Sequence, residues 1–228
     1  MTRPIFYYIT DRHAFSGDDR SRRQQLLGKI EEACDAGIDY IQLREKDLPA
    51  RELEALSREA LKIVHKTSLR TKNRKSGTSV PEPRTLLLIN SRTDVALAIG
   101  ADGAHLPAGD LDVDEVRRVW RLRGADVRRE AKISVSCHSL EEVARAEASG
   151  ADLAIFAPVF EKKDAPGTRP TGRAALRQAC QHKIPVIALG GITLENANAC
   201  LEAGAAGIAG IRLFQEHNIQ EIVAHLNR

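Results

Sequence analysis

Residues 184–193 read IPVIALGGIT, and residues 207–212, close to the end of the chain, read GIAGIR. Each is a short apolar run with glycine at or near its end, a pattern typical of a buried parallel strand that leads into a loop. A segment with the apolar spacing of a helix follows each run, at 193–206 and at 218–228. The two stretches therefore predict two consecutive strand–helix units.

The same alternation extends back to the start of the chain. Six earlier apolar runs, each followed by a helical pattern, are found at 5–10, 40–43, 85–90, 103–106, 132–136 and 152–157. Several helical segments end in glycine, which adopts a positive φ at little cost and so favours a helix C-terminus. These glycines are Gly37, Gly100, Gly150 and Gly204. Eight such units in 228 residues predict an α/β fold, a (β/α)8 TIM barrel forming a single domain over residues 1–228, with an open doubly wound sheet as the alternative.

Composition sets the class of protein. The chain is 43% hydrophobic and 29% charged, and its formal charge of +3 is too small to indicate nucleic acid or membrane binding. It has no apolar run of the roughly 18 to 20 residues that cross a membrane, and its start lacks the pattern of a signal peptide. Its four cysteines show no CxxC spacing. We expect a cytoplasmic protein with reduced thiols and no nucleic acid or membrane partner, and the sequence leaves a homo-oligomer open.

Two basic segments interrupt this pattern. Residues 68–85, SLRTKNRKSGTSVPEPRT, hold five Lys or Arg and two Pro with almost no large apolar side chain, which predicts an exposed or disordered insert. Residues 117–130 are interpreted as a solvated helix face and loop.

The active site of a TIM barrel lies at the C-terminal ends of its strands. The stretch YIQLREKD (40–47) places three large polar side chains on one face of a predicted strand, because side chains alternate faces. They are Gln42, Arg44 and Lys46. Charges directed into a barrel need partners. An anionic ligand and pairing with Glu45 or Asp47 are the two explanations.

Other predicted strand ends add polar side chains to the same region. They are Asn90, His105, Ser136 and His138. His138 is either a residue of a helix-capping region or a proton carrier, because the reference pKa of histidine is near 6.5. Asp110, in the loop after His105, is either a metal ligand or the N-cap of the next helix.

Glycines after the last two strands predict a phosphate site, because they let backbone N–H groups approach a phosphate closely. Gly190 and Gly191 follow one strand, and Gly210 precedes Arg212 after the other. The loop EKKDAPGTRPTG (161–172) carries two further cations and is interpreted as a lid or a plain surface loop. These cations are Lys162 and Lys163. Together these features predict a barrel that binds phosphorylated small molecules.

Five stretches together resemble the thiamine phosphate synthase and thiazole tautomerase superfamily. They are YYITDRH (7–13), QLREKD (42–47), LLINSRTDVALAIGADGAHL (87–106), SVSCHSLEEVARAEASGADLAIFAPVF (134–160) and IPVIALGGIT (184–193). The resemblance covers nearly the whole chain outside 68–85. It implies one of two reactions. The synthase joins hydroxymethylpyrimidine diphosphate to thiazole phosphate and expels diphosphate with Mg²⁺, whereas the tautomerase shifts protons on a thiazole phosphate carboxylate without a metal.

The resemblance also implies roles for particular residues. For the synthase it implies a clamp on the pyrimidine diphosphate by Gln42, Arg44 and Lys46, Mg²⁺ on Asp110, and substrate contacts by Asn90, Ser136 and Gly191. It also implies that Lys162 matches a lysine of the loop after the sixth strand, and we expect Arg44, Lys46 and Lys162 to be catalytic. For the tautomerase it implies a catalytic role for His138.

Three departures from the synthase pattern stand out. Ser91 replaces a second Mg²⁺ carboxylate, the loop after Phe160 lacks a Thr-x-Thr, and Arg212 stands where a small serine is expected. We expect a synthase that uses Mg²⁺, a transferase of thiamine biosynthesis. A tautomerase and a barrel that binds thiazole or thiamine phosphates without turnover are the alternatives.

Overall fold

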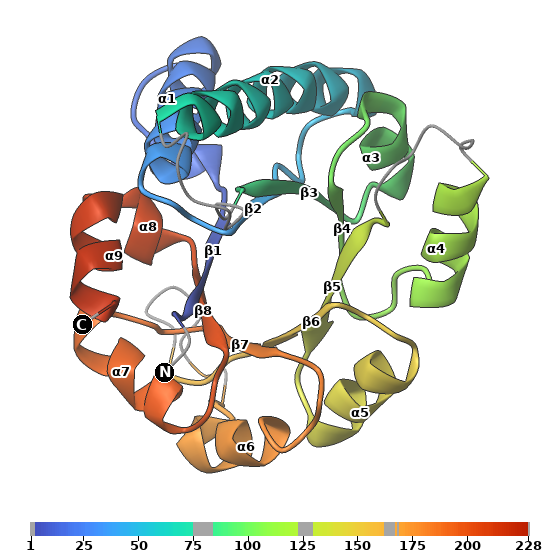
Figure 1. Cartoon of the computed structure of the whole chain (residues 1–228), viewed down its shortest axis with the longest axis vertical. Coiled ribbons are helices and arrows are strands. Elements are labelled where there is room, and N and C mark those ends of the chain that lie inside the picture. The colour runs from blue at the N-terminus through green and yellow to red at the C-terminus, as the bar shows by residue number, and fades with distance from the viewer. Residues whose placement is uncertain (1–2, 75–83, 123–129, 162–166, 168, 228) are drawn as a thin grey trace.

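The computed structural model describes residues 3–74, 84–122, 130–161, 167 and 169–227. Eight parallel strands form a closed barrel in chain order, and β8 pairs with β1 (Figure 1). The strands are β1 (Ile5–Ile9), β2 (Tyr40–Leu43), β3 (Leu86–Asn90), β4 (Gly103–Leu106), β5 (Lys132–Cys137), β6 (Leu153–Phe156), β7 (Val186–Ala188) and β8 (Gly207–Gly210). The TIM barrel is confirmed, and the open sheet is wrong.

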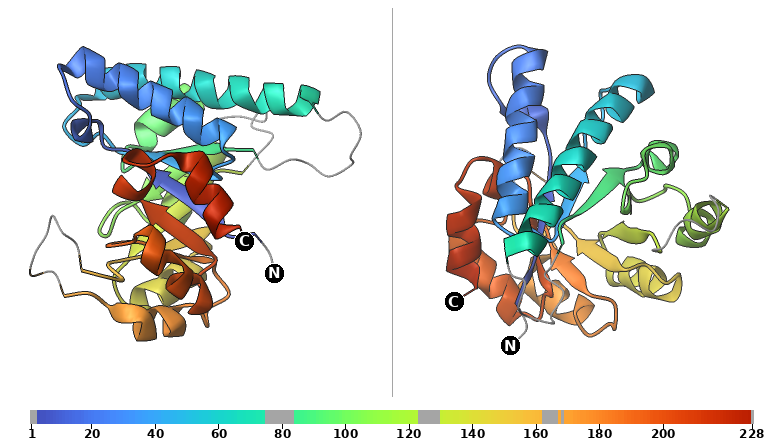
Figure 2. Two further views of the ribbon diagram at one scale, coloured as in Figure 1. Left: turned by 90° about the vertical axis from the view of Figure 1, so that its left-hand side faces the viewer. Right: turned by 45° about the horizontal axis from the view of Figure 1, so that its top comes forward.

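Helices form the outer ring, and α1 lies beside α2 on one side of the barrel (Figure 2). They are α1 (Asp19–Asp35), α2 (Ala50–Arg74), α3 (Thr93–Ile99), α4 (Val113–Arg121), α5 (Leu140–Ala148), α6 (Gly172–Ala179), α7 (Leu194–Glu202), α8 (Arg212–Gln215) and α9 (Ile219–Leu226), with a 3-10 turn η1 (Arg12–Ala14). In the described part of the chain, no helix is long and apolar enough to span a membrane.

The predicted insert at 68–85 is partly wrong. Helix α2 continues to Arg74, because residues 68–74 contain neither Gly nor Pro and the helix-breaking residues come only later. Residues 75–83 lie outside the described part of the chain. Thr85, at the end of the predicted insert, is buried and donates a hydrogen bond to the carbonyl of Ile38 just before β3.

The strands have two apolar faces, as alternation requires. One set of side chains fills the barrel interior, and includes Tyr7, Leu153, Ile155, Ile187 and Ala209. The other set packs against the helices in the main core. All four cysteines are free thiols, and three of them are buried.

The base of the barrel repeats one device. A Gly-x-Asp sequence precedes β2, β4 and β6, and the aspartate accepts a hydrogen bond from the backbone N–H of the preceding odd-numbered strand. The three bonds are Phe6 N to Asp39 at 2.8 Å, Leu87 N to Asp102 at 3.0 Å and Ile133 N to Asp152 at 2.9 Å. The glycines have φ of 81°, 75° and 69°, which confirms the predicted left-handed helix ends. Before β8, Gly204 keeps this conformation but Ala206 replaces the aspartate.

Candidate functional site

Strands β2 and β3 together place a hydrogen-bonded polar pair near the barrel mouth. Gln42 is buried, and its Nε2 donates a 2.8 Å hydrogen bond to Oδ1 of Asn90 at the end of β3. Within the described residues, Oε1 of Gln42 is buried and accepts no hydrogen bond. A buried acceptor without a donor costs free energy. This atom therefore suits a ligand that brings an N–H or O–H group.

The predicted row of polar side chains extends beyond the strand. Strand β2 ends at Leu43, so Arg44 and Lys46 lie in the following loop. Arg44 is half-buried and close enough to His105 for its charge to lower the histidine pKa. The charge of Arg44, followed by burial, also lowers the pKa of the exposed Lys46. Two cations are therefore held near each other at the barrel mouth.

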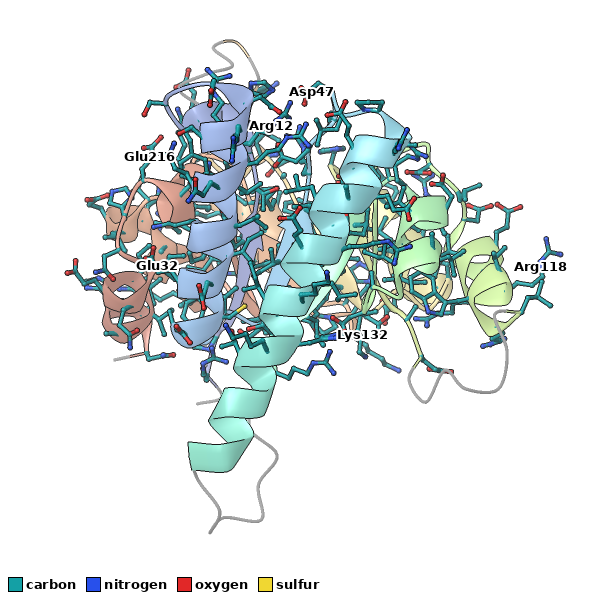
Figure 3. The ribbon with its side chains drawn as sticks, turned by 90° about the horizontal axis from the view of Figure 1, so that it is seen from above. Arg12, Glu32, Asp47, Arg118, Lys132 and Glu216 are labelled. Carbon is teal, nitrogen blue, oxygen red and sulfur yellow. The ribbon has the colours of Figure 1, made fainter. Side chains whose placement is uncertain are left out.

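A third cation, Arg12 in η1, binds the two carboxylates of the same loop, Glu45 and Asp47. Buried Glu45 accepts hydrogen bonds from the Thr10 hydroxyl at 2.6 Å, from the backbone N–H of Arg12 at 3.0 Å and from its Nη1 at 3.3 Å. Asp47 receives both Nη groups of Arg12, one of them at 2.6 Å. Figure 3 shows Arg12 and Asp47 together at one end of α1 and α2. The guanidinium holds the pKa of Asp47 well below its usual range.

This network answers the question that the sequence left open. Glu45 and Asp47 are bound by Arg12, and no hydrogen bond or ion pair within the described residues joins either of them to Arg44 or Lys46. Pairing inside the loop is therefore wrong as the explanation of these cations. An anionic ligand stays the prediction for these two cations.

A chain of hydrogen bonds runs through the barrel interior. The Tyr7 hydroxyl lies 2.8 Å from Ser134 Oγ, which is 2.9 Å from Nδ1 of His105. Nε2 of His105 lies 2.9 Å from Oγ of the half-buried Ser136. Burial, helped by the charge of Arg44, lowers the pKa of His105 to about 3. His105 is therefore neutral at physiological pH.

Asp110 is not the N-cap of the helix that follows it. Asp112 caps α4, in a capping box with Glu115. Asp110 instead accepts hydrogen bonds from the Ser91 hydroxyl at 2.7 Å and from the backbone N–H of Leu111 at 2.8 Å. The structure thus brings together the two positions that the resemblance associates with Mg²⁺, one of them a hydroxyl.

The donor set at this point is small. In the described part of the chain, no three His, Cys, Asp or Glu side chains form a group able to hold a metal ion. Mg²⁺ often binds proteins through one or two carboxylates and takes its other ligands from water and substrate phosphates. The Asp110 carboxylate and Ser91 hydroxyl fit a Mg²⁺ ion of that kind, which would arrive with a phosphorylated substrate.

His138 is exposed at the end of β5. Its Nδ1 lies 2.7 Å from the carbonyl oxygen of Ala157. Because a carbonyl only accepts, Nδ1 carries the proton and Nε2 is left with a lone pair. The backbone N–H of His138 is bound by Glu142, so the residue also belongs to the start of α5. The capping and proton-carrier interpretations are thus compatible.

The two glycines after β7 adopt a positive φ, and Phe160 and Glu161 pack closely against the second of them. Gly190 and Gly191 have φ of 96° and 66°. A Cβ at Gly191 would lie 2.4 Å from the carbonyl oxygen of Glu161, so no larger residue fits. Within the described residues, the N–H groups of these two glycines donate no backbone hydrogen bond. Close packing explains Gly191, and the N–H groups are still available to a phosphate.

The remaining predicted site residues are placed less centrally. Gly210 faces outward, where a Cβ would lie 3.0 Å from Leu213 of α8. Arg212 is half-buried at the start of α8. Lys162 and Lys163, with most of the proposed lid, lie outside the described residues.

Sequence reasoning missed three residues of this region. Tyr7 and Ser134 sit at inward positions of their strands, and alternation alone could have placed them there. The role of Arg12 had no local signal, because its partners Glu45 and Asp47 lie more than thirty positions away in the chain.

Comparison with known proteins identifies the same family that the sequence motifs resemble. A family model described as thiamine monophosphate synthase matches residues 6–214. A protein named putative thiamine-phosphate synthase 2 from Aquifex aeolicus is 36% identical over 217 residues, which cover 95% of this chain and 100% of that protein. A thiamine-phosphate synthase from Halalkalibacterium halodurans is 33% identical over 201 residues, covering 87% of this chain and 84% of that protein.

Solved structures agree. A thiamine phosphate pyrophosphorylase from Pyrococcus furiosus matches with a TM-score of 0.73 and 28% identity, over 97% of this chain and 93% of that one. A (S)-3-O-geranylgeranylglyceryl phosphate synthase from Thermoplasma acidophilum matches with a TM-score of 0.63 and 19% identity, over 99% and 94% of the two chains. The second likeness concerns the fold alone.

Proposed function

The chain belongs to the thiamine monophosphate synthase family, and from this premise we propose that it joins a hydroxymethylpyrimidine diphosphate to a thiazole phosphate. A bond forms between the methylene carbon of the pyrimidine and the thiazole nitrogen. The carbon–oxygen bond to diphosphate breaks, and its electron pair leaves with the diphosphate. The protein would act as a transferase.

One observation carries this proposal. Arg44 and Lys46 lie together while the neighbouring carboxylates are bound by Arg12. Negative charge grows on the departing diphosphate, and cations already in place stabilise such charge without reorganisation. Arg44 and Lys46, which no carboxylate among the described residues pairs, are therefore suited to bind the diphosphate and to promote its departure.

Two further features fit the same substrates. The buried acceptor Oε1 of Gln42 suits an amino group on a pyrimidine ring, because a phosphate offers no donor there. The N–H groups of Gly190 and Gly191, ahead of α7, suit the phosphate of the thiazole.

Mg²⁺ would be held by Asp110 and Ser91 together with substrate oxygens. When bound, the ion would neutralise charge on the diphosphate. The chain's own part is to position the substrates with Gln42 and Asn90 and to receive the diphosphate on Arg44 and Lys46.

The test is formation of thiamine phosphate from both substrates with Mg²⁺. We expect Arg44→Ala to lower kcat/KM by about 10²-fold or more, as removal of a charge-stabilising donor does. Arg58→Ala, on the exposed side of α2 where Arg58 pairs with Glu54, is the matched control and should leave turnover unchanged. Absence of product from the complete mixture with either Mg²⁺ or Mn²⁺ would reject the proposal.

His138 supports a second candidate, the metal-independent tautomerisation of a thiazole phosphate carboxylate. Its Nε2 can accept and return a proton, because Nδ1–H is held by Ala157. This reaction should proceed in EDTA and collapse in His138→Ala. A rate unaffected by that substitution would reject the role, and binding of thiazole phosphate with neither reaction would indicate a barrel that only binds its ligand.

A further inference from the structure

The hydrogen-bonded chain inside the barrel links three strands. Tyr7 comes from β1, His105 from β4, and Ser134 and Ser136 from β5. Strands β1 and β5 lie on opposite sides of the barrel (Figure 1). The hydrogen bond between the Tyr7 hydroxyl and Ser134 therefore joins these two sides across the interior. The chain runs from this buried hydroxyl to Ser136 at the mouth.

The direction of each hydrogen bond follows from where protons can go. Tyr7 is buried, and within the described residues its hydroxyl has Ser134 as its one hydrogen-bond partner. A buried hydroxyl that fails to donate loses free energy, so Tyr7 donates to Ser134. Burial also raises the pKa of Tyr7, which keeps the phenol protonated.

Because Ser134 accepts from Tyr7, its own hydroxyl proton must go to a different acceptor. Its second partner is Nδ1 of His105, and it is fully buried, so its hydroxyl donates to that nitrogen. A neutral imidazole carries one N–H, and Nδ1 is already accepting. The proton of His105 therefore lies on Nε2 and points at Oγ of Ser136.

This arrangement decides what Ser136 can offer. If Ser136 donated to His105, it would present only lone pairs to the mouth of the barrel, and these repel an anion. Because it accepts from Nε2–H, its own proton remains available, and a hydroxyl that donates to a charged oxygen makes a strong hydrogen bond.

We propose that Ser134 is a positioning residue: it donates to Nδ1 of His105, fixes the Nε2–H tautomer, and so leaves the Ser136 hydroxyl to donate to an anionic substrate group. The identity of that group as a diphosphate rests on the proposed function. The tautomer of His105 is independent of that function, because it follows from the hydrogen bonds inside the barrel.

The tautomer can be observed directly by ¹⁵N NMR of histidine-labelled protein at pH 7, with the His105 signals assigned by their loss in His105→Gln. We expect a protonated Nε2 and an unprotonated Nδ1 in the wild type. Tyr7→Phe is the matched control, because it removes a hydrogen bond from the same chain yet leaves Ser134 with His105 as its acceptor. It should keep the Nε2–H tautomer, whereas Ser134→Ala should populate both tautomers.

Binding of inorganic diphosphate with Mg²⁺, measured by calorimetry, provides the second readout. Ser134→Ala should weaken it about three- to tenfold, the worth of one hydrogen bond, and Tyr7→Phe should not. In a Ser136→Ala background, Ser134→Ala should cost no further affinity. A wild-type Nδ1–H tautomer, or equal affinity in wild type and Ser134→Ala, would overturn the inference. Loss of thiamine phosphate formation with this tautomer and affinity pattern intact would instead count against the proposed function alone.

Discussion

Ser91 donates a 2.7 Å hydrogen bond to Asp110, which ties the loop after β3 to the loop after β4. Ser91 has φ of 62°, and it is the one residue other than glycine with a positive φ among the described positions. Asp and Asn adopt this conformation more readily than other non-glycine residues. The backbone at position 91 is thus shaped for a residue that the chain does not have.

Ser91→Asp is expected to lower the Mg²⁺ concentration that gives half-maximal synthesis by roughly tenfold, because a second carboxylate faces the ion. In EDTA the two carboxylates repel, so Mg²⁺ should raise the Tm of this variant more than that of the wild type. Ser91→Asn is the control, since it suits the same backbone without adding charge. Identical Mg²⁺ dependence in Ser91→Asp and Ser91→Asn would show that no ion binds between these loops.

Arg12→Met should weaken diphosphate binding roughly tenfold even though Arg12 belongs to a different loop from the clamp. The half-exposed Asp47 would lose its guanidinium and could pair with Arg44 or Lys46 instead. Adding Asp47→Asn should restore much of the affinity, as measured by calorimetry. Arg23→Met, which disturbs pairs with Asp19 and Glu52 on the outer helices, should leave binding unchanged. A double variant no better than Arg12→Met would mean that Arg12 acts only through stability.

His105 should make the protein less stable in acid. Its folded pKa of about 3 lies below its ordinary value of about 6.5. Between these values the unfolded chain binds the proton and the folded chain does not, so the free energy of unfolding falls as the pH drops from 6.5 towards 3. Urea denaturation from pH 7 to pH 4 should show a shallower fall in His105→Gln, since other groups titrate alike in both proteins. Parallel curves would contradict a neutral buried His105.

Gly191→Ala is expected to lower the free energy of unfolding by about 1–3 kcal/mol, because φ is positive and the added Cβ would press on the carbonyl of Glu161. Gly28→Ala is its control. Gly28 lies inside α1 with no atom within 4 Å of an added Cβ, so alanine should stabilise the helix by about 0.5–1 kcal/mol. The same urea titration checks both, and equal effects at the two positions would contradict this account.

The fold could be predicted from the sequence because its signals are local. Apolar strands followed by glycine-capped helices recur in order, and the cap glycines Gly37, Gly100 and Gly150 adopt the expected backbone. The end of α2 was harder to predict. Residues 68–74 are polar enough for a loop, and it is the structure that shows them to be the last two turns of α2.

The site was predictable only in part. Gln42 could be found from the alternation of side chains along its strand, and Arg44 and Asn90 from the ends of their apolar runs. The sequence could not show whether Glu45 neutralises Arg44 and Lys46, because the residue that binds Glu45 instead, Arg12, lies 33 positions away in the chain. The direction of the bonds through Ser134 depends on three strands meeting in space.

The aspartates at the base of the barrel bear on the order in which it can assemble. They join residues only 33, 15 and 19 positions apart, so β1–β2, β3–β4 and β5–β6 can each form with a small loss of chain entropy. Pairing of β8 with β1 joins residues about two hundred positions apart, Ile5 with Gly207, and the last pair of strands has Ala206 in place of the aspartate. The barrel is thus built from three locally fastened pairs of parallel strands and a fourth pair, β7 and β8, without that fastening, and the ring is completed when this fourth pair joins β1.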